Sequence, residues 1–265
     1  MDEYTRELIE GARSAYGEVV AGKDSRIQRG KVLWDQFEAA ADACRTGGKD
    51  SERQLGERIN ELAVAKVLAD DKHLRGPITY EPNLLSSKRR IDFVADRVRD
   101  NLYVEVKTVH PETADTKEAW DHFLKLREFH PKQANFIVHE DWMGGKLYGN
   151  TFSSRSKFLD YTRAFEDRLS EAKRGKDGPG ILVFCGNGAR WHRSDLEDFA
   201  DFYHAGKHRQ DDPFALMEQH DMERRRIKLL QNVDHFACLR RPMEQASMQD
   251  IHYPVRGPSF GGVIR

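Results

Sequence analysis

Cysteines and long apolar runs are scarce in this sequence of 265 residues. The three cysteines, Cys44, Cys185 and Cys238, are odd in number and far apart. Their spacing argues against a disulfide framework and against a zinc knuckle. No apolar run approaches the length of a transmembrane helix, and the acidic start of the chain is unlike a signal peptide. We therefore expect a cytoplasmic protein that is not bound to a membrane.

The sequence also lacks a marked excess of charge of either sign. Lys and Arg number 43 and Asp and Glu 44, which gives a formal net charge of -1 at pH 7. The chain therefore has none of the overall positive charge of many duplex-binding proteins, and contacts with phosphate groups must come from local clusters. Lys88, Arg89 and Arg90 form the best placed of these clusters, because they directly precede an acidic segment that begins at Asp92.

Residues 90–107 have the pattern of two short strands around a polar turn. Apolar residues alternate with other types along the second strand, so Glu105 and Lys107 share one face of it. The turn at residues 99–101 folds Asp92 back toward this pair. The hairpin therefore brings two carboxylates and a lysine together.

Two carboxylates and a lysine suit metal-assisted hydrolysis of a phosphodiester. Carboxylate oxygens are hard ligands that hold Mg²⁺, whose remaining positions bind water and phosphate oxygens. A lysine beside them orients the attacking water or stabilises developing negative charge. The alternative is that Glu105 and Lys107 form an ion pair on a solvated face of the sheet, where it would contribute little stability.

The same residues resemble the motif of the PD-(D/E)XK nuclease superfamily, D-(x)n-E-x-K. Asp92, Glu105, Val106 and Lys107 match it, with twelve residues between the two acids, and Ile91 stands where the family usually has proline. The resemblance implies that Asp92, Glu105 and the Val106 carbonyl bind Mg²⁺, for which Mn²⁺ can substitute. It also implies that Lys107 is the water-orienting or charge-stabilising group.

A helix predicted before the hairpin supplies two further acids. Residues 55–70 contain strong helix formers and a broad apolar stripe, as expected for a helix packed on a sheet. Glu57 and Glu61 lie four residues apart on it, and Glu61 shares its side with apolar residues. The resembling family often has a glutamate on this helix, which implies that Glu61 completes the metal site. Two exposed glutamates on an ordinary helix are the alternative, and Glu57 remains the other choice for the site.

The predicted order of elements extends the resemblance to residues 51–140. A first strand is expected at 76–82, then the hairpin, then a helix at 116–129 and a strand at 135–139. Helix, three strands, helix and strand form the αβββαβ core of that family. The resemblance thus implies an α/β protein with a restriction endonuclease-like core, in which helices flank a central mixed sheet.

The flanking segments are expected to add to this core. Residues 5–20 and 25–44 have helical periodicity and predict an N-terminal helical hairpin over residues 1–50, followed by a nuclease-like domain over 51–265. A C-terminal α/β extension is predicted as well. Its elements are helices at 152–173, after Ser194 and at 218–230, strands at 180–186 and 232–239, and an irregular tail at 254–265.

The function implied is that of a Mg²⁺-dependent endonuclease acting on DNA in restriction, repair or defence. DNA is favoured by analogy with proteins of this architecture. Lys88, Arg89, Arg90 and His110 are the candidate substrate-binding residues, and a homodimer or a multi-protein system is a possible setting. Two alternatives stay open: a catalytically silent subunit that binds nucleic acid or assembles with partners, and an RNA-cutting, toxin-like effector.

Overall fold

The computed structural model describes most of the first 109 residues and five later segments. These are Met1 and residues 3–47, 50–72, 74–84, 90–97, 99–109, 154–172, 178–186, 193–205, 228–240 and 251–252. The chain divides into two compact units, the first made of residues 1–109, 164–187 and 231–265 and the second of 110–163 and 188–230. Each unit is described by itself. None of the described helices is long and apolar enough to span a bilayer.

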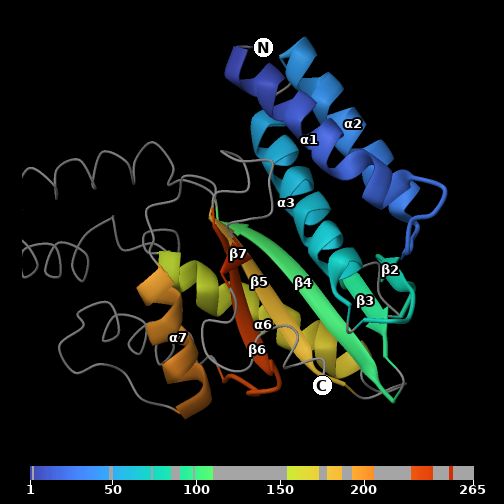
Figure 1. Ribbon diagram of the computed structural model, residues 1–265. Coiled ribbons are helices and arrows are strands. Elements are labelled where there is room, and N and C mark those ends of the chain that lie inside the picture. Colours follow the sequence, from blue (N-terminus) through green and yellow to red (C-terminus); the bar gives the residue numbers. More distant parts are fainter. Residues whose placement is uncertain are drawn as a thin grey trace, which may run out of the picture. The chain divides into compact units, whose positions relative to one another are not determined.

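The first unit is an α/β structure with a mixed sheet of seven strands (Figure 1). Its helices are α1 (Glu3–Ala21), α2 (Gly30–Thr46), α3 (Ser51–Asp70) and the second half of α6 (Ser154–Ala172). Its strands are β1 (Ile27–Gln28), β2 (Ile78–Tyr80), β3 (Phe93–Asp96), β4 (Asn101–Val109), β5 (Gly180–Gly186), β6 (His235–Arg240) and β7 (Ile251–His252). The strands lie in the order of the sequence.

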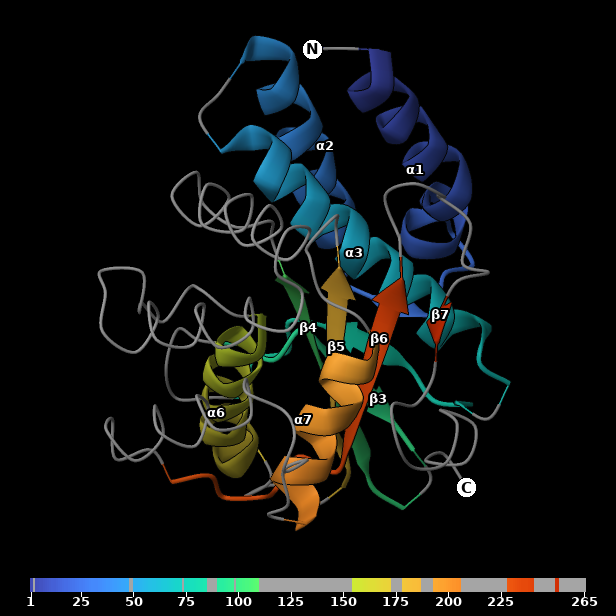
Figure 2. The same cartoon turned by 90° about the vertical axis from the view of Figure 1, so that its left-hand side faces the viewer.

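Strand directions change three times across the sheet. The pairs β2 with β3, β3 with β4 and β6 with β7 are antiparallel. The pairs β1 with β2, β4 with β5 and β5 with β6 are parallel, and β5 and β6 run side by side in Figure 2. The expected mixed sheet flanked by helices is therefore confirmed.

Strand β4 divides its side chains between two faces, as the alternating pattern predicts. Leu102, Val104 and Val106 belong to one hydrophobic core with helices α1, α2 and α3. Glu105 and Lys107 lie on the opposite face. The described residues of α6 in this unit contact that second face, where Leu169 packs against Gly180 so closely that a Cβ on Gly180 would come within 2.3 Å of it.

Helix α3 confirms the predicted amphipathic helix. Its apolar stripe is buried in the core, with the side chains of Leu55, Ile59, Leu62, Ala65 and Leu68 at most 1% exposed. The neighbouring polar residue Asn60 is also buried, and its Nδ2 donates a hydrogen bond of 2.7 Å to Thr108 Oγ1 on β4. This buried bond joins α3 directly to β4.

The N-terminal segment differs from the predicted helical hairpin in its connection. Residues 25–29 were predicted to be helical, but Ile27 and Gln28 form β1, which pairs with β2. Helix α2 begins only at Gly30, because Arg29 has a left-handed φ of 62° and the Gly30 Cα approaches the Val20 carbonyl too closely for any side chain. Both α1 and α2 belong to the unit that holds the sheet.

The neighbour of β4 also differs from the prediction. Residues 135–139 were expected to follow the hairpin as the last core strand, and residues 180–186 were assigned to the extension. In the structure β5, residues 180–186, pairs with β4 over seven residues. Two predicted core elements, 116–129 and 135–139, lie outside the described residues. Among the described elements, the order α3, β2, β3, β4, α6, β5 is nevertheless helix, three strands, helix and strand.

The other predicted elements of the C-terminal part are met in some places and not in others. Helix α6 and β5 lie in the predicted ranges, and α7 (Arg193–Ala205) follows β5. Strand β6 begins at His235, three residues later than predicted. Within the second unit, Phe158 of α6 and Phe199 of α7 lie with ring centroids 5.8 Å apart. Of the predicted helix 218–230, only residues 228–230 are described, and they are not helical. Residues 254–265 lie outside the described residues.

Candidate functional site

Asp92 lies at the point where β3 and β4 separate. The ladder between these strands ends at the pair Phe93 and Val104, and its register would place Ile91 opposite Val106. Instead, the Val106 N–H donates a hydrogen bond of 2.7 Å to Asp92 Oδ2. The carboxylate thus takes the place of a strand carbonyl, which satisfies the buried N–H and inserts an acid between the strands.

Glu105 and Lys107 project from the face of β4 opposite the helical core. Lys107 Nζ lies 2.6 Å from Glu105 Oε1. Only 1% of the Glu105 side chain is exposed, against 26% for Lys107. The alternative of a solvated ion pair is therefore wrong, because the Glu105 carboxylate is buried and the Lys107 side chain is only partly exposed.

A second cation, Arg168 of α6, contacts the same carboxylate oxygen. Its Nη2 forms an ion pair with Glu105 Oε1, and 13% of the Arg168 side chain is exposed. Sequence reasoning missed this residue. One signal in the sequence could have found it. Arg168 lies beside Leu169 and three residues after Phe165, at the border of the apolar stripe of the helix. A charged residue at such a border faces the sheet in part.

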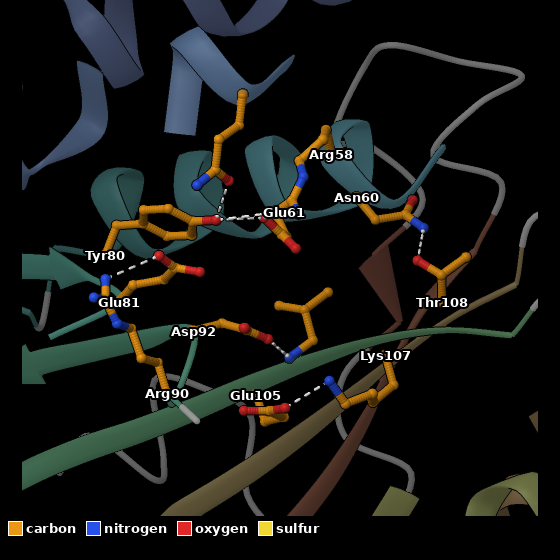
Figure 3. Close-up of polar contacts among 12 residues, drawn as sticks. Arg58, Asn60, Glu61, Tyr80, Glu81, Arg90, Asp92, Glu105, Lys107 and Thr108 are labelled. Carbon is orange, nitrogen blue, oxygen red and sulfur yellow. Dashed lines mark hydrogen bonds and ion pairs between the residues drawn. The ribbon is translucent and has the colours of Figure 1, made fainter. Parts of the chain in front are cut away.

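Glu61 faces the hairpin (Figure 3) and is less exposed than Glu57. The side chain of Glu61 is 13% exposed and that of Glu57 33%, and Glu57 pairs along its own helix with Arg53 at 3.5 Å. Glu61 Oε2 accepts hydrogen bonds from Arg58 Nη1 at 2.6 Å and from the Tyr80 hydroxyl at 2.8 Å. Arg58 and Tyr80 were also missed, although the spacing of three residues between Arg58 and Glu61 is a usable signal.

The Tyr80 hydroxyl extends this network to the N-terminal helices. It lies 2.9 Å from Gln36 Oε1 on α2 and accepts a hydrogen bond of 3.0 Å from Arg58 Nη1. Because a hydroxyl has one proton, it donates to either Glu61 or Gln36 at a time. Burial, followed by the charge of Glu61, raises the pKa of Tyr80, so the phenol stays neutral.

Asp92 lies between the helix glutamate and the pair on β4 (Figure 3). Burial raises the pKa of Glu61 to about 8, and the charge of Asp92 adds to the effect. The same two causes, in the same order, raise the pKa of Glu105 to about 7. The charge of Asp92 therefore opposes the ionisation of both glutamates, which is the condition that a divalent cation relieves.

Lys107 keeps its proton. Burial alone would lower its pKa, but the charges of Asp92 and Glu105 outweigh burial and raise it. Lys107 is therefore an ammonium at neutral pH and cannot act as a general base there. It can donate hydrogen bonds and neutralise negative charge.

The predicted substrate-binding residues are described only in part. Arg90 Nη1 lies 3.3 Å from Glu81 Oε2, beside the site (Figure 3). Lys88, Arg89 and His110 lie outside the described residues. Glu81 itself adopts a left-handed φ of 41°, and its N–H donates a 2.7 Å hydrogen bond to the Asp92 carbonyl. Asp92 is thus tied by its backbone to the end of β2 and by its side chain to β4.

The donor set fits a hard divalent cation, although the part of the chain that the structure describes contains no cluster of three His, Cys, Asp or Glu side chains arranged around a common point. Glu105 Oε2 is buried and has no hydrogen-bond partner among the described residues. The Val106 carbonyl points to the same side of β4 as its N–H, which is the side of Asp92. Asp92, Glu105 and the Val106 carbonyl are therefore the groups available to hold Mg²⁺.

Comparison of the chain with models of known protein families, with curated protein sequences and with solved structures gave no match.

Proposed function

We propose that this chain is a Mg²⁺-dependent nuclease of the PD-(D/E)XK type that cleaves DNA as an endonuclease. The observation that carries the proposal is the position of Asp92, whose carboxylate is hydrogen-bonded to Val106 between Glu105 and Lys107 of the same motif. Two acids and a protonated lysine at the opening of a β-hairpin form a site suited to phosphodiester hydrolysis.

The order of elements supports the same proposal. The described elements α3, β2, β3, β4, α6 and β5 follow the αβββαβ order of that family, with β5 parallel to β4. Glu61 comes from the helix that precedes the three strands, where the family often has its additional glutamate. These likenesses concern architecture, so they support the fold assignment more strongly than the choice of substrate.

In the proposed mechanism each side chain has a separate task. Asp92 and Glu105, with the Val106 carbonyl, would hold the Mg²⁺, which supplies Lewis-acid activation of the phosphate and lowers the pKa of bound water. Lys107, which is protonated, donates hydrogen bonds to the attacking water or to a phosphate oxygen. Glu61 would hold a water molecule or contribute to the ion site from α3. Arg90 would contact the nucleic acid backbone once it leaves Glu81.

The direct test is cleavage of plasmid and linear DNA by the purified full-length chain. We expect nicking or cutting with Mg²⁺ or Mn²⁺ and none after chelation with EDTA, because without an ion the carboxylates repel the phosphate. RNA and branched DNA should be tested in parallel, since the RNA-cutting alternative uses the same site. Cleavage that survives chelation would disprove the metal mechanism.

One observation favours the second candidate, a subunit that binds nucleic acid without hydrolysis. Glu61 and Glu105 are each already paired with cations of the chain itself, Arg58 on one side and Lys107 with Arg168 on the other. A site so neutralised can hold a fold together without any metal. Titration with Mn²⁺ separates the candidates, because the silent subunit would bind nucleic acid with no dependence on the ion.

A further inference from the structure

The ion pair between Arg168 and Glu105 joins residues 63 positions apart in the sequence. Both belong to the first compact unit, Glu105 on β4 and Arg168 on the second half of α6. Burying a pair of charges costs several kcal/mol per ion in desolvation, and replacing such pairs with apolar residues is often neutral for stability. Stability alone therefore gives little reason for two cations on one carboxylate.

The two oxygens of Glu105 have very different surroundings. Oε1 contacts both Lys107 and Arg168. Oε2 is buried and has no partner among the described residues. An ionised carboxylate offers about four acceptor positions, and leaving one of its oxygens buried without a donor is costly. The arrangement is accounted for if Oε2 has another partner during function.

We propose that Arg168 is a positioning residue of the site, which holds Glu105 Oε1 away from the hairpin opening so that Oε2 is the oxygen presented to the divalent cation. This inference rests on the proposed function and adds a residue from α6, outside the motif, to it. Arg168 itself touches neither the ion nor the substrate in this role.

The physical reason lies in the freedom of the glutamate side chain. The terminal torsion of a glutamate is broad, so a single contact does not fix which oxygen faces which partner. Lys107 is a flexible donor that the proposed mechanism also requires for water or phosphate. A planar guanidinium from a different element, bound to the same oxygen, fixes the carboxylate while leaving Lys107 able to shift its hydrogen bonds.

The experiment measures Mn²⁺ binding to the metal-free full-length chain by calorimetry, with no substrate present. Arg168→Gln removes the positive charge, whereas Arg168→Lys keeps the charge but replaces the planar guanidinium with a single ammonium group. Arg163→Gln on the same helix is the matched control, because Arg163 is exposed. We expect about 10- to 100-fold weaker binding for Arg168→Gln, the range found for residues that orient metal ligands. Arg168→Lys should be intermediate and Arg163→Gln unchanged.

The main competing explanation predicts the opposite change in Mn²⁺ affinity. If Arg168 only repels the ion or competes with it for Glu105, Arg168→Gln would bind Mn²⁺ as tightly as the wild-type chain or more tightly, and this outcome overturns the inference. Should Arg168→Gln fail to fold, as judged by circular dichroism, the Lys variant decides: wild-type affinity overturns the inference and weaker binding supports it.

Failure of the proposed function looks different. A wild-type chain that binds no Mn²⁺ overturns the metal-dependent function and, with it, the role of Arg168. A wild-type chain that binds Mn²⁺ through Asp92, with a folded Arg168→Gln that binds equally well, overturns the role of Arg168 alone.

Discussion

The two sides of the candidate site hold their carboxylates in different ways. On the strand side, Glu105 is held only by cations, Lys107 and Arg168, and one of its oxygens has no partner among the described residues. On the helix side, Glu61 is held by one cation, Arg58, and by the neutral phenol of Tyr80, which also reaches Gln36. The strand side therefore has unused acceptor and donor capacity, whereas the helix side is a network that connects the site to α2.

If the chain has the proposed function, this difference predicts that the strand side performs the chemistry. Groups with unused capacity can bind an ion and a phosphate without first breaking contacts, while a hydrogen-bonded network keeps its members in place. We therefore expect substitutions on the strand side to have the largest effect on turnover. Substitutions on the helix side should have smaller effects, on metal binding and stability.

The largest expected effect is on turnover at the hairpin. Asp92→Ala and Lys107→Ala should each lower the cleavage rate by about 100-fold or more, as loss of one charge-stabilising group does in other enzymes. Asp92→Ala should also weaken Mn²⁺ binding, because it deletes a ligand, and Lys107→Ala should not. Cleavage assays and calorimetry measure the two effects, with Asp96→Ala on the exposed end of β3 as a control. Equal loss of metal affinity in both variants would show that the roles are wrongly assigned.

A smaller effect is expected at the helix glutamate. Glu61→Gln should lower the cleavage rate by roughly 10- to 100-fold, the range for groups that support a metal site. Glu57→Gln, four residues away on the same helix, should cleave near the wild-type rate because Glu57 pairs with Arg53. Comparison of the two rates at saturating Mg²⁺ tests the orientation of α3. The reverse ranking would contradict the position of Glu61 at the site.

The third prediction concerns the pH dependence of stability, which follows from the two carboxyl groups with raised pKa values. Glu105 and Glu61 have pKa values raised from 4.5 to about 7 and about 8, so between these limits the folded chain binds more protons than the unfolded chain. Without metal, proton binding by these two carboxyl groups therefore stabilises the folded chain. This contribution to the free energy of unfolding is complete below pH 4.5 and is lost as the pH rises through about 7 and 8.

Mg²⁺ should reverse this trend, because the ion binds the ionised carboxylates and competes with protons. Ion at about a hundredfold excess over Kd adds about 2.7 kcal/mol, which corresponds to roughly 5 to 10 °C in Tm for a chain of this size. Calorimetric scans should show this shift at about pH 8.5 and a clearly smaller one at about pH 5.5. A Tm shift that does not depend on pH would show that Glu61 and Glu105 do not take part in metal binding.

The smallest expected effect is on the neutral member of the helix side. Tyr80→Phe removes a hydroxyl that contacts Glu61, Arg58 and Gln36, and should lower the free energy of unfolding by about 1 kcal/mol, the usual contribution of a hydrogen bond. Cleavage should change little. Urea unfolding of Tyr80→Phe, Glu61→Gln and the double variant gives the coupling energy between them. Additive effects would mean that the hydroxyl does not hold Glu61.

The elements with strong periodicity were predictable from the sequence. The apolar stripe of α3 and the uniformly apolar β5 carry long signals, and both occur where they were predicted. Strand β1 has only two residues, too few for any period, and its location depends on pairing with β2. The neighbour of β4 could not be chosen either, because several later segments contain apolar residues and only packing decides which one extends the sheet.

By itself, the sequence determined which residue types stand at fixed spacing: the acids and lysine of the hairpin on one face, and Glu61 on a helix ahead of them. These relations are local, since the periods of strands and helices decide them. Only the tertiary structure decided that Glu61 contacts Tyr80, that Glu105 is buried, and that Arg168 contacts Glu105. Those contacts join positions 19 and 63 residues apart, and no local period connects residues at such separations.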